Sequence, residues 1–366
     1  MQGERAGHRA VGRRRAVHDP DGLNTGIWPV STDHLVTPTD LFFTRSHAAI
    51  PSIDSRTWRL ELSGLVERPG TFSLAELVSR FPKRDIVATL VCAGLRREEF
   101  FSLGALPGEL PWGPEPISTG RWGGISLGDL LRSVGIADTA RHVELVGLDR
   151  VERHEVQFGF GGSIEIAKAL SDEVLLATEL NGAPIPPQHG FPLRAVVPGW
   201  IGARSVKWLG RVTLLAEPSL NYFQSKAYRL QREITPADPR DVTAGVALSA
   251  IPLNSVIVEP LSKAVILPGR LKVAGWAIGS EGRPLKTVEL SSDAGNTWTP
   301  ARFAVEGERW AWSFWEGELR LPPGRHQLAV RATDTAGTTQ PATVRDTWNV
   351  KGYNNNAWHR VDVVAE

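Results

Sequence analysis

Residues 89–100 read TLVCAGLRREEF and contain Cys92, the only cysteine among the 366 residues of the chain. Cys92 follows an apolar, partly β-branched run and precedes the paired arginines Arg96 and Arg97. A single cysteine cannot form a disulfide within the chain, so any task it has is chemical. The neighbouring guanidiniums favour a thiolate, which is both a nucleophile and a soft metal ligand. From this segment alone, burial as a small apolar side chain is the more common outcome.

The composition is that of a globular protein of about two domains. Hydrophobic residues make up 42% of the chain and charged residues 22%, with a net charge of +1. This balance argues against a general nucleic-acid binder, which needs a basic surface. No apolar run approaches the ~20 residues of a membrane-spanning helix. We therefore expect neither nucleic acid nor membrane as a partner.

One cysteine also excludes a disulfide framework, a zinc ribbon and c-type haem attachment. The first residues carry arginines without a following apolar stretch, so no export signal is visible. As written, the chain is expected in the cytoplasm. A periplasmic location would require a misplaced start site, with the arginines near residue 13 as the remnant of an export signal.

The pattern along the chain predicts an arm and two domains. Residues 1–34 are mostly polar and arginine-rich and predict an N-terminal arm, with order beginning between residues 24 and 38. Residues 35–235 mix strands, expected at 58–64 and 143–147, with helices expected at 73–80 and 126–134. Ser73 and Glu76 have the spacing of a capping box. This irregular alternation favours an α+β domain.

The C-terminal part has a different pattern. Residues 232–245 are polar and contain proline, as linkers often do. After them, segments such as RLKVAGWAIG and RHQLAVRATD alternate apolar and polar residues, and turn signals lie at residues 293–296 and 322–324. About seven short strands in residues 245–366 predict an immunoglobulin-like sandwich.

Three further segments of the first domain concentrate cationic or hydroxyl side chains. LFFTRSHAAIP places Arg45 and His47 two residues apart, on one side of an extended chain. Residues 181–208 hold several cations among glycines and prolines, which suits an oxyanion or a phosphate although no P-loop is present. These cations are His189, Arg194, Arg204 and Lys207. Tyr228, in FQSKAYRL, is by default a packing residue.

The order of these segments is more informative than any one of them. FFTRSH at residues 42–47, CAGLRR at 92–97 and the stretch from Trp112 to Trp122 are followed by HGFPLR, VPGWIGARSVKW and WNVKGYNNNAWHRV. In this order they resemble the sulfite oxidase family of molybdopterin-dependent oxidoreductases, in a bacterial, haem-free form. Ser46 and Leu95 each stand where the family has an asparagine. The resemblance runs from about Pro38 to the C-terminus.

The resemblance implies an α+β molybdopterin-binding domain followed by an all-β immunoglobulin-like domain that forms a homodimer. Cys92 would be the single protein ligand to the molybdenum of the Mo-molybdopterin cofactor. Positions matching the family's cofactor contacts are Phe43, Thr44, Arg45, Ser46, His47, Asp149, His189, Arg194, Ser205, Val206 and Lys207. Positions matching its catalytic oxyanion pocket are Arg45, Arg97, Trp112, Tyr228 and Lys351, where lysine replaces the usual arginine. The resemblance assigns no role to Arg96.

The activity implied is oxidation of sulfite to sulfate by oxygen-atom transfer at the cysteine-ligated molybdenum. No haem, flavin or iron-sulfur cluster is expected in this chain, so an external cytochrome or oxygen would accept the electrons. Nitrate is an alternative oxyanion, because eukaryotic nitrate reductases share the scaffold. Two other hypotheses stay open, a cofactor-free interaction protein with an inert Cys92 and a hydrolase using Cys92 with His189.

Overall fold

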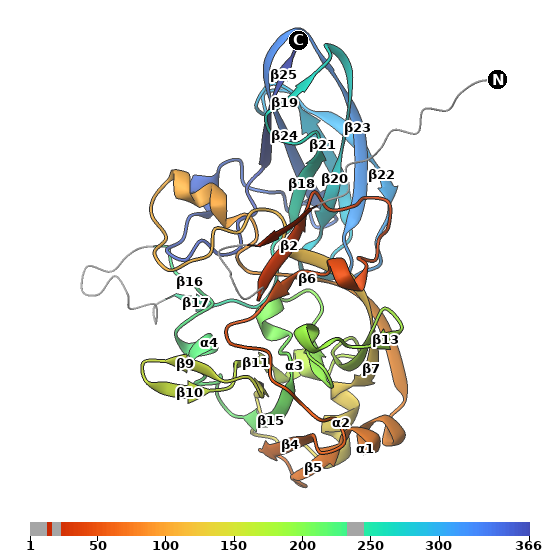
Figure 1. Cartoon of the computed structure of the whole chain (residues 1–366), viewed down its shortest axis with the longest axis vertical. Coiled ribbons are helices and arrows are strands. Elements are labelled where there is room, and N and C mark those ends of the chain that lie inside the picture. Colours follow the sequence, from red (N-terminus) through yellow and green to blue (C-terminus); the bar gives the residue numbers. More distant parts are fainter. Residues whose placement is uncertain (1–12, 17–22, 233–244) are drawn as a thin grey trace, which may run out of the picture.

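The computed structural model of the chain describes residues 13–16, 23–232 and 245–366. Figure 1 shows the mixed first domain in the lower half and the β-rich C-terminal domain above it. The linker predicted at residues 232–245 falls almost entirely outside the described residues. So do residues 1–12 and 17–22 of the predicted arm. The predicted domain boundaries therefore stay predictions.

The first domain contains a five-stranded sheet with the order β11-β8-β15-β4-β5. Its strands are β4 (Arg59–Gly64), β5 (Gly70–Ser73), β8 (His142–Gly147), β11 (Gly161–Glu165) and β15 (Leu209–Leu215). β15 pairs parallel with β4 and antiparallel with β8. The strands predicted near residues 58–64 and 143–147 are confirmed as β4 and β8.

A second sheet in this domain has the order β13-β12-β7-β6, with β14 paired to β12. Its strands are β6 (Lys83–Val91), β7 (Ile117–Ser126), β12 (Leu175–Leu180), β13 (Ala183–Pro184) and β14 (Arg194–Val196). β6 pairs with β7 along its whole length and ends at Val91. Cys92 is therefore held at the end of a buried strand.

Two helices close the main apolar core of this domain, as the sequence predicts. α1 (Leu74–Arg80) begins with the expected capping box, because the Ser73 hydroxyl accepts from Glu76 N and the Glu76 carboxylate accepts from Ser73 N. α2 (Leu127–Val134) is capped by Ser126 and buries Leu130 and Leu131. Both helices pack on the core formed by β4, β8 and β15.

The chain also contains shorter helices and strands. They are α3 (Ile166–Ala169), α4 (Tyr222–Ser225), η1 (Thr39–Leu41), η2 (Arg97–Ser102), η3 (Pro187–His189), η4 (Gly202–Arg204), η5 (Ser280–Gly282), η6 (Val344–Thr347), β9 (Val151–Arg153), β10 (Val156–Phe158), β16 (Arg229–Leu230) and β17 (Val246–Ala247). β9 and β10 form an antiparallel pair, as do β16 and β17.

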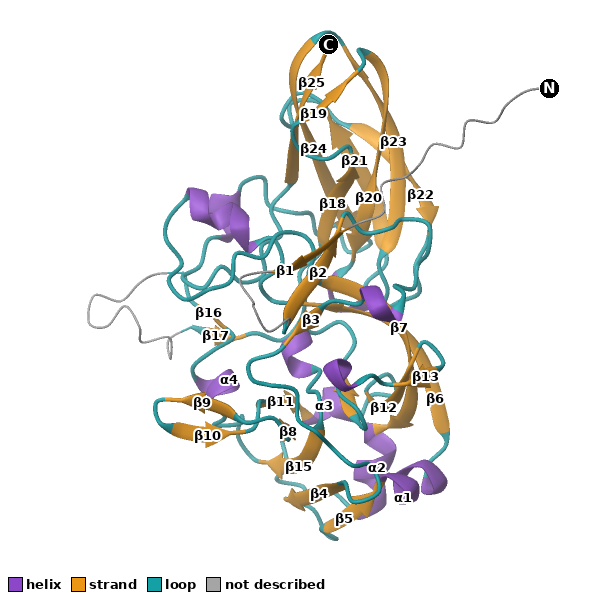
Figure 2. Cartoon of the chain, in the orientation of Figure 1, coloured by secondary structure: helices purple, strands orange, loops and turns teal. Residues whose placement is uncertain are grey.

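The C-terminal domain is the immunoglobulin-like sandwich that the alternating pattern predicts (Figure 2). Its strands are β18 (Asn254–Glu259), β19 (Ala264–Ile266), β20 (Gly269–Ile278), β21 (Leu285–Ser291), β22 (Thr299–Val305), β23 (Ser313–Leu321), β24 (Gly324–Asp334) and β25 (His359–Ala365). Inward side chains of β18, β20 and β23 pack against those of β21, β24 and β25. The core thus lies between two layers of strands.

The N-terminal residues are more regular than the predicted arm. β1 (Arg13–Ala16), β2 (Asn24–Trp28) and β3 (Thr44–Arg45) form an antiparallel sheet in which Asn24 is opposite Arg45. β3 belongs to the FFTRSH motif. The pairing joins residues about twenty positions apart, so the local pattern of residues 1–34 could not reveal it.

The two domains share an apolar core. Val91, Ala93 and Leu95 pack in one cluster with residues of the sandwich that include Val256 and Trp276. The CAGLRR motif therefore lies where the domains meet. Leu95, which departs from the family pattern, is 3% exposed and contributes to this core.

Arg96 links the domains by polar contacts. It is fully buried, and its side chain pairs with both carboxylate oxygens of Glu99. Its Nη1 donates to Asn254 Oδ1 at 2.9 Å and to Ala357 O at 2.8 Å, both in the C-terminal domain. The structure thus gives Arg96 a position in the domain junction. In the part of the chain that the structure describes, no helix has the length and apolarity to cross a membrane.

Candidate functional site

A pocket lies beside the end of β6 in the first domain. Segments far apart in the sequence form its wall. It is lined by Phe42, Phe43, Arg45, Ser46, His47, Leu90, Cys92, Ala93, Asp149, Phe160, His189, Arg194, Gly202, Ala203, Ser205, Lys207, Trp208 and Tyr228.

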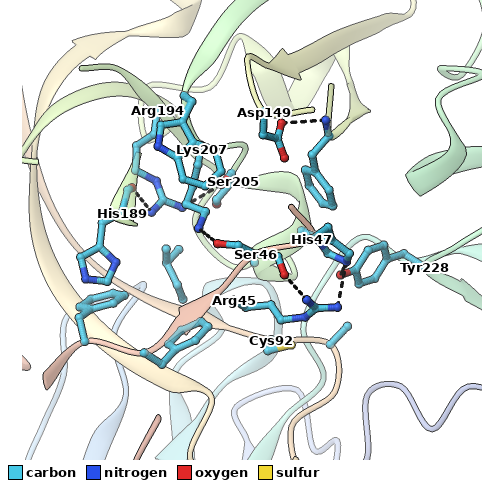
Figure 3. Close-up of a pocket in the computed structure, with 18 residues that line it drawn as sticks. Arg45, Ser46, His47, Cys92, Asp149, His189, Arg194, Ser205, Lys207 and Tyr228 are labelled. Atoms are coloured by element: carbon cyan, nitrogen blue, oxygen red, sulfur yellow. Dashed lines mark hydrogen bonds between the residues drawn. The ribbon is translucent and has the colours of Figure 1, made fainter. Parts of the chain in front are cut away.

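Most of the positions predicted to bind cofactor lie in this wall. They are Phe43, Arg45, Ser46, His47, Asp149, His189, Arg194, Ser205 and Lys207, together with Cys92 and Tyr228. Thr44 and Val206 are buried beside the pocket without lining it. In the view of Figure 3, Arg194, Lys207 and Ser205 gather at one end of the pocket, and Cys92 lies toward the other. Arg194 and Lys207 are therefore separated from the thiol, whereas Arg45 lies toward the Cys92 end.

Cys92 is held in a way that suits a thiolate. Its side chain is 8% exposed, and Gly94 N donates a hydrogen bond to its Sγ at 3.4 Å. An N–H donor stabilises negative charge on sulfur. A Cβ at Gly94 would come within 2.8 Å of Arg97 Nη1, so a larger residue there would displace the Arg97 guanidinium. The motif thus places the thiol at the pocket wall and the guanidinium behind it.

The opposite end of the pocket contains a buried arginine and a partly buried lysine, both with neutral hydrogen-bond partners. Arg194 donates to the carbonyls of His189 and Ser205, each at 2.8 Å. Lys207 Nζ donates to Ser46 Oγ at 2.6 Å and to Gln188 O at 3.0 Å. Burial lowers the pKa of Arg194 to about 9. Burial, with repulsion from Arg194, lowers the pKa of Lys207 well below its usual range.

Buried cations held by carbonyl and hydroxyl oxygens are costly unless an anion neutralises them. Ser46 takes part in this arrangement although it replaces the family's asparagine, because its hydroxyl accepts from Lys207. This end of the pocket therefore suits the phosphate of a ligand.

Asp149 provides the acidic group of the pocket wall. Its Oδ1 accepts from Phe160 N at 2.9 Å. Burial raises the pKa of Asp149, while that hydrogen bond and the charge of Lys207 oppose the rise. An acceptor in this position can hold an N–H group of a ligand whose anionic end lies near Lys207.

Arg45, His47 and Tyr228 form a hydrogen-bonded group on the pocket wall. Arg45 Nη2 and the Tyr228 hydroxyl each lie 3.1 Å from His47 Nε2. An arginine can only donate, so Nε2 must accept and the ring proton of neutral His47 lies on Nδ1. The Tyr228 hydroxyl is then also a donor toward Nε2. Arg45 Nη1 in turn donates to Asn24 Oδ1 at 2.9 Å, which ties this group to β2.

The same contacts explain the protonation states of this group. Burial, followed by the charge of Arg45, lowers the pKa of His47 well below its usual range. Burial raises the pKa of Tyr228 to about 12, against the opposing charges of Arg45 and Arg97. At neutral pH the pocket therefore presents an imidazole without charge, a phenol with its proton and the cation of Arg45.

The remaining predicted catalytic residues do not line the pocket. Arg97 Nε donates to Lys351 O at 2.9 Å, Nη1 donates to Leu110 O at 3.0 Å, and Nη2 pairs with Glu109 Oε2 at 3.2 Å. Lys351 Nζ pairs with Glu109 Oε1, also at 3.2 Å. The Arg97 guanidinium lies 5.1 Å from the ring centroid of Tyr353. The two cations and the carboxylate that they share form a second group, here called the Glu109 cluster: Arg97, Glu109 and Lys351.

The Glu109 cluster is adjacent to the pocket rather than part of its wall. Tyr353 stacks on Tyr228 with their centroids 5.3 Å apart, and Tyr228 borders the pocket. Trp112 is fully buried in the apolar cluster that also contains Cys92. The sequence did not single out Glu109, because a glutamate in the segment PGELP carries no recognisable signal.

Several lining residues were also missed. The wall also contains Phe160, Gly202, Ala203 and Trp208. The sequence could not identify them as lining residues, because apolar and small side chains have no distinctive spacing there. Arg204, one of the cations noted in the sequence, is fully buried and donates to Phe223 O at 3.0 Å. It lies behind the wall and does not line the pocket.

The donor set decides what kind of metal site this can be. Within residues 13–16, 23–232 and 245–366, no group of three or more histidine, cysteine or acidic side chains could hold a metal ion. Cys92 would supply one soft thiolate ligand to a metal at its end of the pocket. A soft thiolate at one end and buried cations at the other fit a sulfur-ligated metal carried by a phosphorylated cofactor.

Comparisons with known proteins agree with this geometry. A family model described as "Oxidoreductase molybdopterin binding domain" matches residues 47–223, and one described as "Mo-co oxidoreductase dimerisation domain" matches residues 246–366. The chain is thus a molybdopterin-binding oxidoreductase with a C-terminal dimerisation domain.

The relatives specify the family. The sulfite oxidase of Gallus gallus is 38% identical, over 90% of this chain and 73% of its own length. The sulfite oxidase of Arabidopsis thaliana is 35% identical, over 89% and 87% respectively. The chain belongs to the sulfite oxidase family of molybdenum-dependent oxidoreductases. The predicted family, two-part fold and enzyme class are confirmed.

Two further similarities mark the breadth of the family. A nitrate reductase of Hordeum vulgare is 35% identical over 90% of this chain, which spans 39% of that protein. The solved structure of the sulfane dehydrogenase SoxCD from Paracoccus pantotrophus has a TM-score of 0.79 and 25% identity, covering 95% of this chain and 87% of that chain. The chain spans 62% of the mitochondrial sulfite oxidase of Homo sapiens.

Proposed function

We propose that this chain oxidises sulfite to sulfate with Mo-molybdopterin as its cofactor. The observation that carries the proposal is one pocket that has the buried Cys92 thiol toward one end and the cations of Arg194 and Lys207 gathered at the other. The relatives named sulfite oxidase, at 35% to 38% identity over most of the chain, support this substrate.

The cofactor is held at both ends. Cys92 supplies the thiolate ligand to molybdenum, and Arg194 and Lys207 bind the phosphate. The other lining positions proposed to contact the pterin are Phe43, Arg45, Ser46, His47, Asp149, His189 and Ser205. Thr44 and Val206, which are buried beside the pocket, stay predictions from the sequence. When bound, Mo-molybdopterin supplies a two-electron redox centre and the oxygen atom that is transferred.

The chain's own residues bind and orient the anion. Sulfite must leave water to reach the pocket, and the Arg45 guanidinium offsets the cost of desolvating it. The Tyr228 hydroxyl keeps its proton at neutral pH and donates it to His47 Nε2, so it would donate to the anion by exchanging that contact. The Arg45 guanidinium is a donor held in place by Asn24 and His47. Preorganised donors of this kind act where charge moves during the reaction. Trp112 packs in the apolar cluster that contains Cys92, and Arg97 and Lys351 add positive charge from beside the pocket.

The reaction has a simple balance. Sulfite gains one oxygen that originates in water, and two electrons and two protons are released. We propose that an external cytochrome or oxygen accepts the electrons, with no haem, flavin or iron-sulfur cluster in this chain. We further propose a homodimer formed through residues 246–366, which match the dimerisation domain model. A cytoplasmic location remains a prediction from the sequence.

The test is steady-state sulfite oxidation by protein shown to contain molybdenum, with ferricyanide, oxygen and cytochrome c as alternative acceptors. The proposal predicts sulfite-dependent reduction of at least one acceptor, lost when Cys92 is replaced by serine. Turnover of nitrate with no turnover of sulfite would transfer the assignment to the alternative oxyanion. A properly matured sample without molybdenum would favour the cofactor-free interaction protein.

A further inference from the structure

The Glu109 cluster contains a carboxylate, whose negative charge repels an anionic substrate in the adjacent pocket. One carboxylate bridges two cations, with Oε1 at 3.2 Å from Lys351 Nζ and Oε2 at 3.2 Å from Arg97 Nη2. The side chain of Glu109 is 16% exposed and that of Lys351 is 30% exposed, so the cluster reaches solvent. Arg97 is 5% exposed and donates its remaining nitrogens to carbonyls. The bridge is therefore a built feature rather than a surface ion pair.

We propose that Glu109 is a specificity-determining residue, which takes the position of an anion between Arg97 and Lys351 and biases the adjacent pocket toward singly charged over doubly charged oxyanions. This proposal rests on the proposed function, because it concerns the charge of the substrate of that same site. Glu109 is not a catalytic residue here; it acts through the two cations.

The cluster is close enough to the pocket for this charge to matter. The Tyr353 ring contacts the Arg97 guanidinium and stacks on Tyr228, and Tyr228 borders the pocket. Burial is the main cause that raises the pKa of Tyr228, and the Glu109 carboxylate raises it further while Arg97 lowers it. The field of Glu109 therefore reaches a side chain that faces the ligand.

Coulomb's law gives the proposal a quantitative form. The interaction energy of a fixed charge with a ligand is proportional to the charge of the ligand. Removing the charge of Glu109 should thus change the binding free energy of a divalent anion by twice as much as that of a monovalent anion. The fold-change in the dissociation constant of the divalent anion is then the square of the fold-change for the monovalent anion. With Glu109 the two cations leave a net charge of +1 on the cluster, and without it they leave +2.

The experiment compares Glu109→Gln with Glu217→Gln in molybdenum-loaded protein. Glu217 is exposed and gives the same change in net charge. Dissociation constants for nitrate and sulfate are measured at equilibrium by calorimetry, without turnover, and as inhibition constants against sulfite. For Glu109→Gln we expect roughly tenfold tighter nitrate and roughly a hundredfold tighter sulfate binding. Glu217→Gln should bind both anions as the wild type does.

Two further variants keep the test decisive. Glu109→Asp retains the charge and should keep the wild-type ratio of the nitrate and sulfate constants. Glu109→Ala should shift the ratio of the nitrate and sulfate constants as Glu109→Gln does. If one of these two uncharged variants fails to fold, the other still tests the proposal. Equal constants in the wild type and both uncharged variants, or weaker binding of both anions, would overturn the proposal.

The equilibrium measurement also separates the two claims. If the loaded protein fails to oxidise sulfite but Glu109→Gln binds sulfate far more tightly, the proposed function fails and the role of Glu109 stands. If sulfite is oxidised and the anion constants do not change, the role of Glu109 fails alone.

Discussion

The pocket and the Glu109 cluster both contain buried or partly buried cations, but the two groups are compensated in different ways. Arg194 and Lys207 donate to carbonyl and hydroxyl oxygens, which leave their positive charge available. Arg97 and Lys351 share a carboxylate of the chain itself. The first arrangement is suited to a permanently bound anion, and the second to an anion that must come and go.

Arg96 shows a third arrangement, although it is next to Arg97 in the sequence. Its charge is paired with Glu99, and its other donors reach the C-terminal domain. Cations within one short motif can therefore serve structure or ligand binding, depending on which carboxylates and carbonyls surround them. Substitutions in each group should separate these tasks.

The largest effect is expected for Cys92→Ser. A serine oxygen is a poor match for a metal otherwise bound by soft sulfur, so we expect sulfite-dependent activity to fall by about a thousandfold and molybdenum content to fall with it. Ferricyanide reduction and metal analysis measure the two quantities. Unchanged circular dichroism would show that folding is retained, whereas full activity would remove Cys92 from the site.

Arg96→Gln should mainly reduce stability. Removing the guanidinium leaves Glu99 and the acceptors of the C-terminal domain without their partner, at a cost of about 3 kcal/mol. We expect a lower urea midpoint for the whole chain and an unchanged Michaelis constant for sulfite in the folded protein. The exposed Arg320, replaced in the same way, is the matched control. A wild-type midpoint for Arg96→Gln would refute the role at the domain junction.

Arg97→Gln should act on the substrate. It removes one of the cations shared with Glu109, so the remaining cluster of Glu109 and Lys351 has no net charge. We expect the Michaelis constant for sulfite to rise about thirtyfold, close to 2 kcal/mol. Molybdenum content should stay near that of the wild type. Equal Michaelis constants in the two proteins would contradict this role.

The smallest effect is expected for His47 under acid conditions. Because the pKa of His47 is lowered well below 6.5 in the folded protein, its contribution to stability is present above pH 6.5 and is lost as the pH falls toward the folded value. Between pH 6.5 and 5.5 the wild type should lose about 1 kcal/mol that His47→Gln does not lose. Urea midpoints at both pH values measure this, with the exposed His34→Gln as control. If His47→Gln lost the same stability between these pH values, His47 would not be the group that titrates.

Local signals in the sequence were enough for much of the fold. The capping box of Ser73 and Glu76 and the period-two alternation after residue 245 each depend on neighbours along the chain, and both predictions are confirmed. The pairing of β2 with β3 could not be predicted in this way. It depends on a partner strand that lies beyond a loop and has only two residues.

The candidate site shows the same limit. Its cations could be found because arginine and lysine stand out among glycines and prolines in residues 181–208. Their counterions could not, because Glu109 meets Arg97 and Lys351 only through folding. A sequence shows which charges are present, while the free energy of a buried charge depends on what surrounds it.

The most direct test of this account is the molybdenum content of folded Lys207→Gln measured beside Arg97→Gln, with the exposed Lys226→Gln as control. We predict that Lys207→Gln retains about a tenth of the wild-type molybdenum or less, because it loses a buried cation that binds the cofactor. Arg97→Gln and Lys226→Gln should retain wild-type amounts. Equal molybdenum in all three variants, or an equal loss in Lys207→Gln and Arg97→Gln, would contradict the division between a cofactor pocket and a substrate cluster.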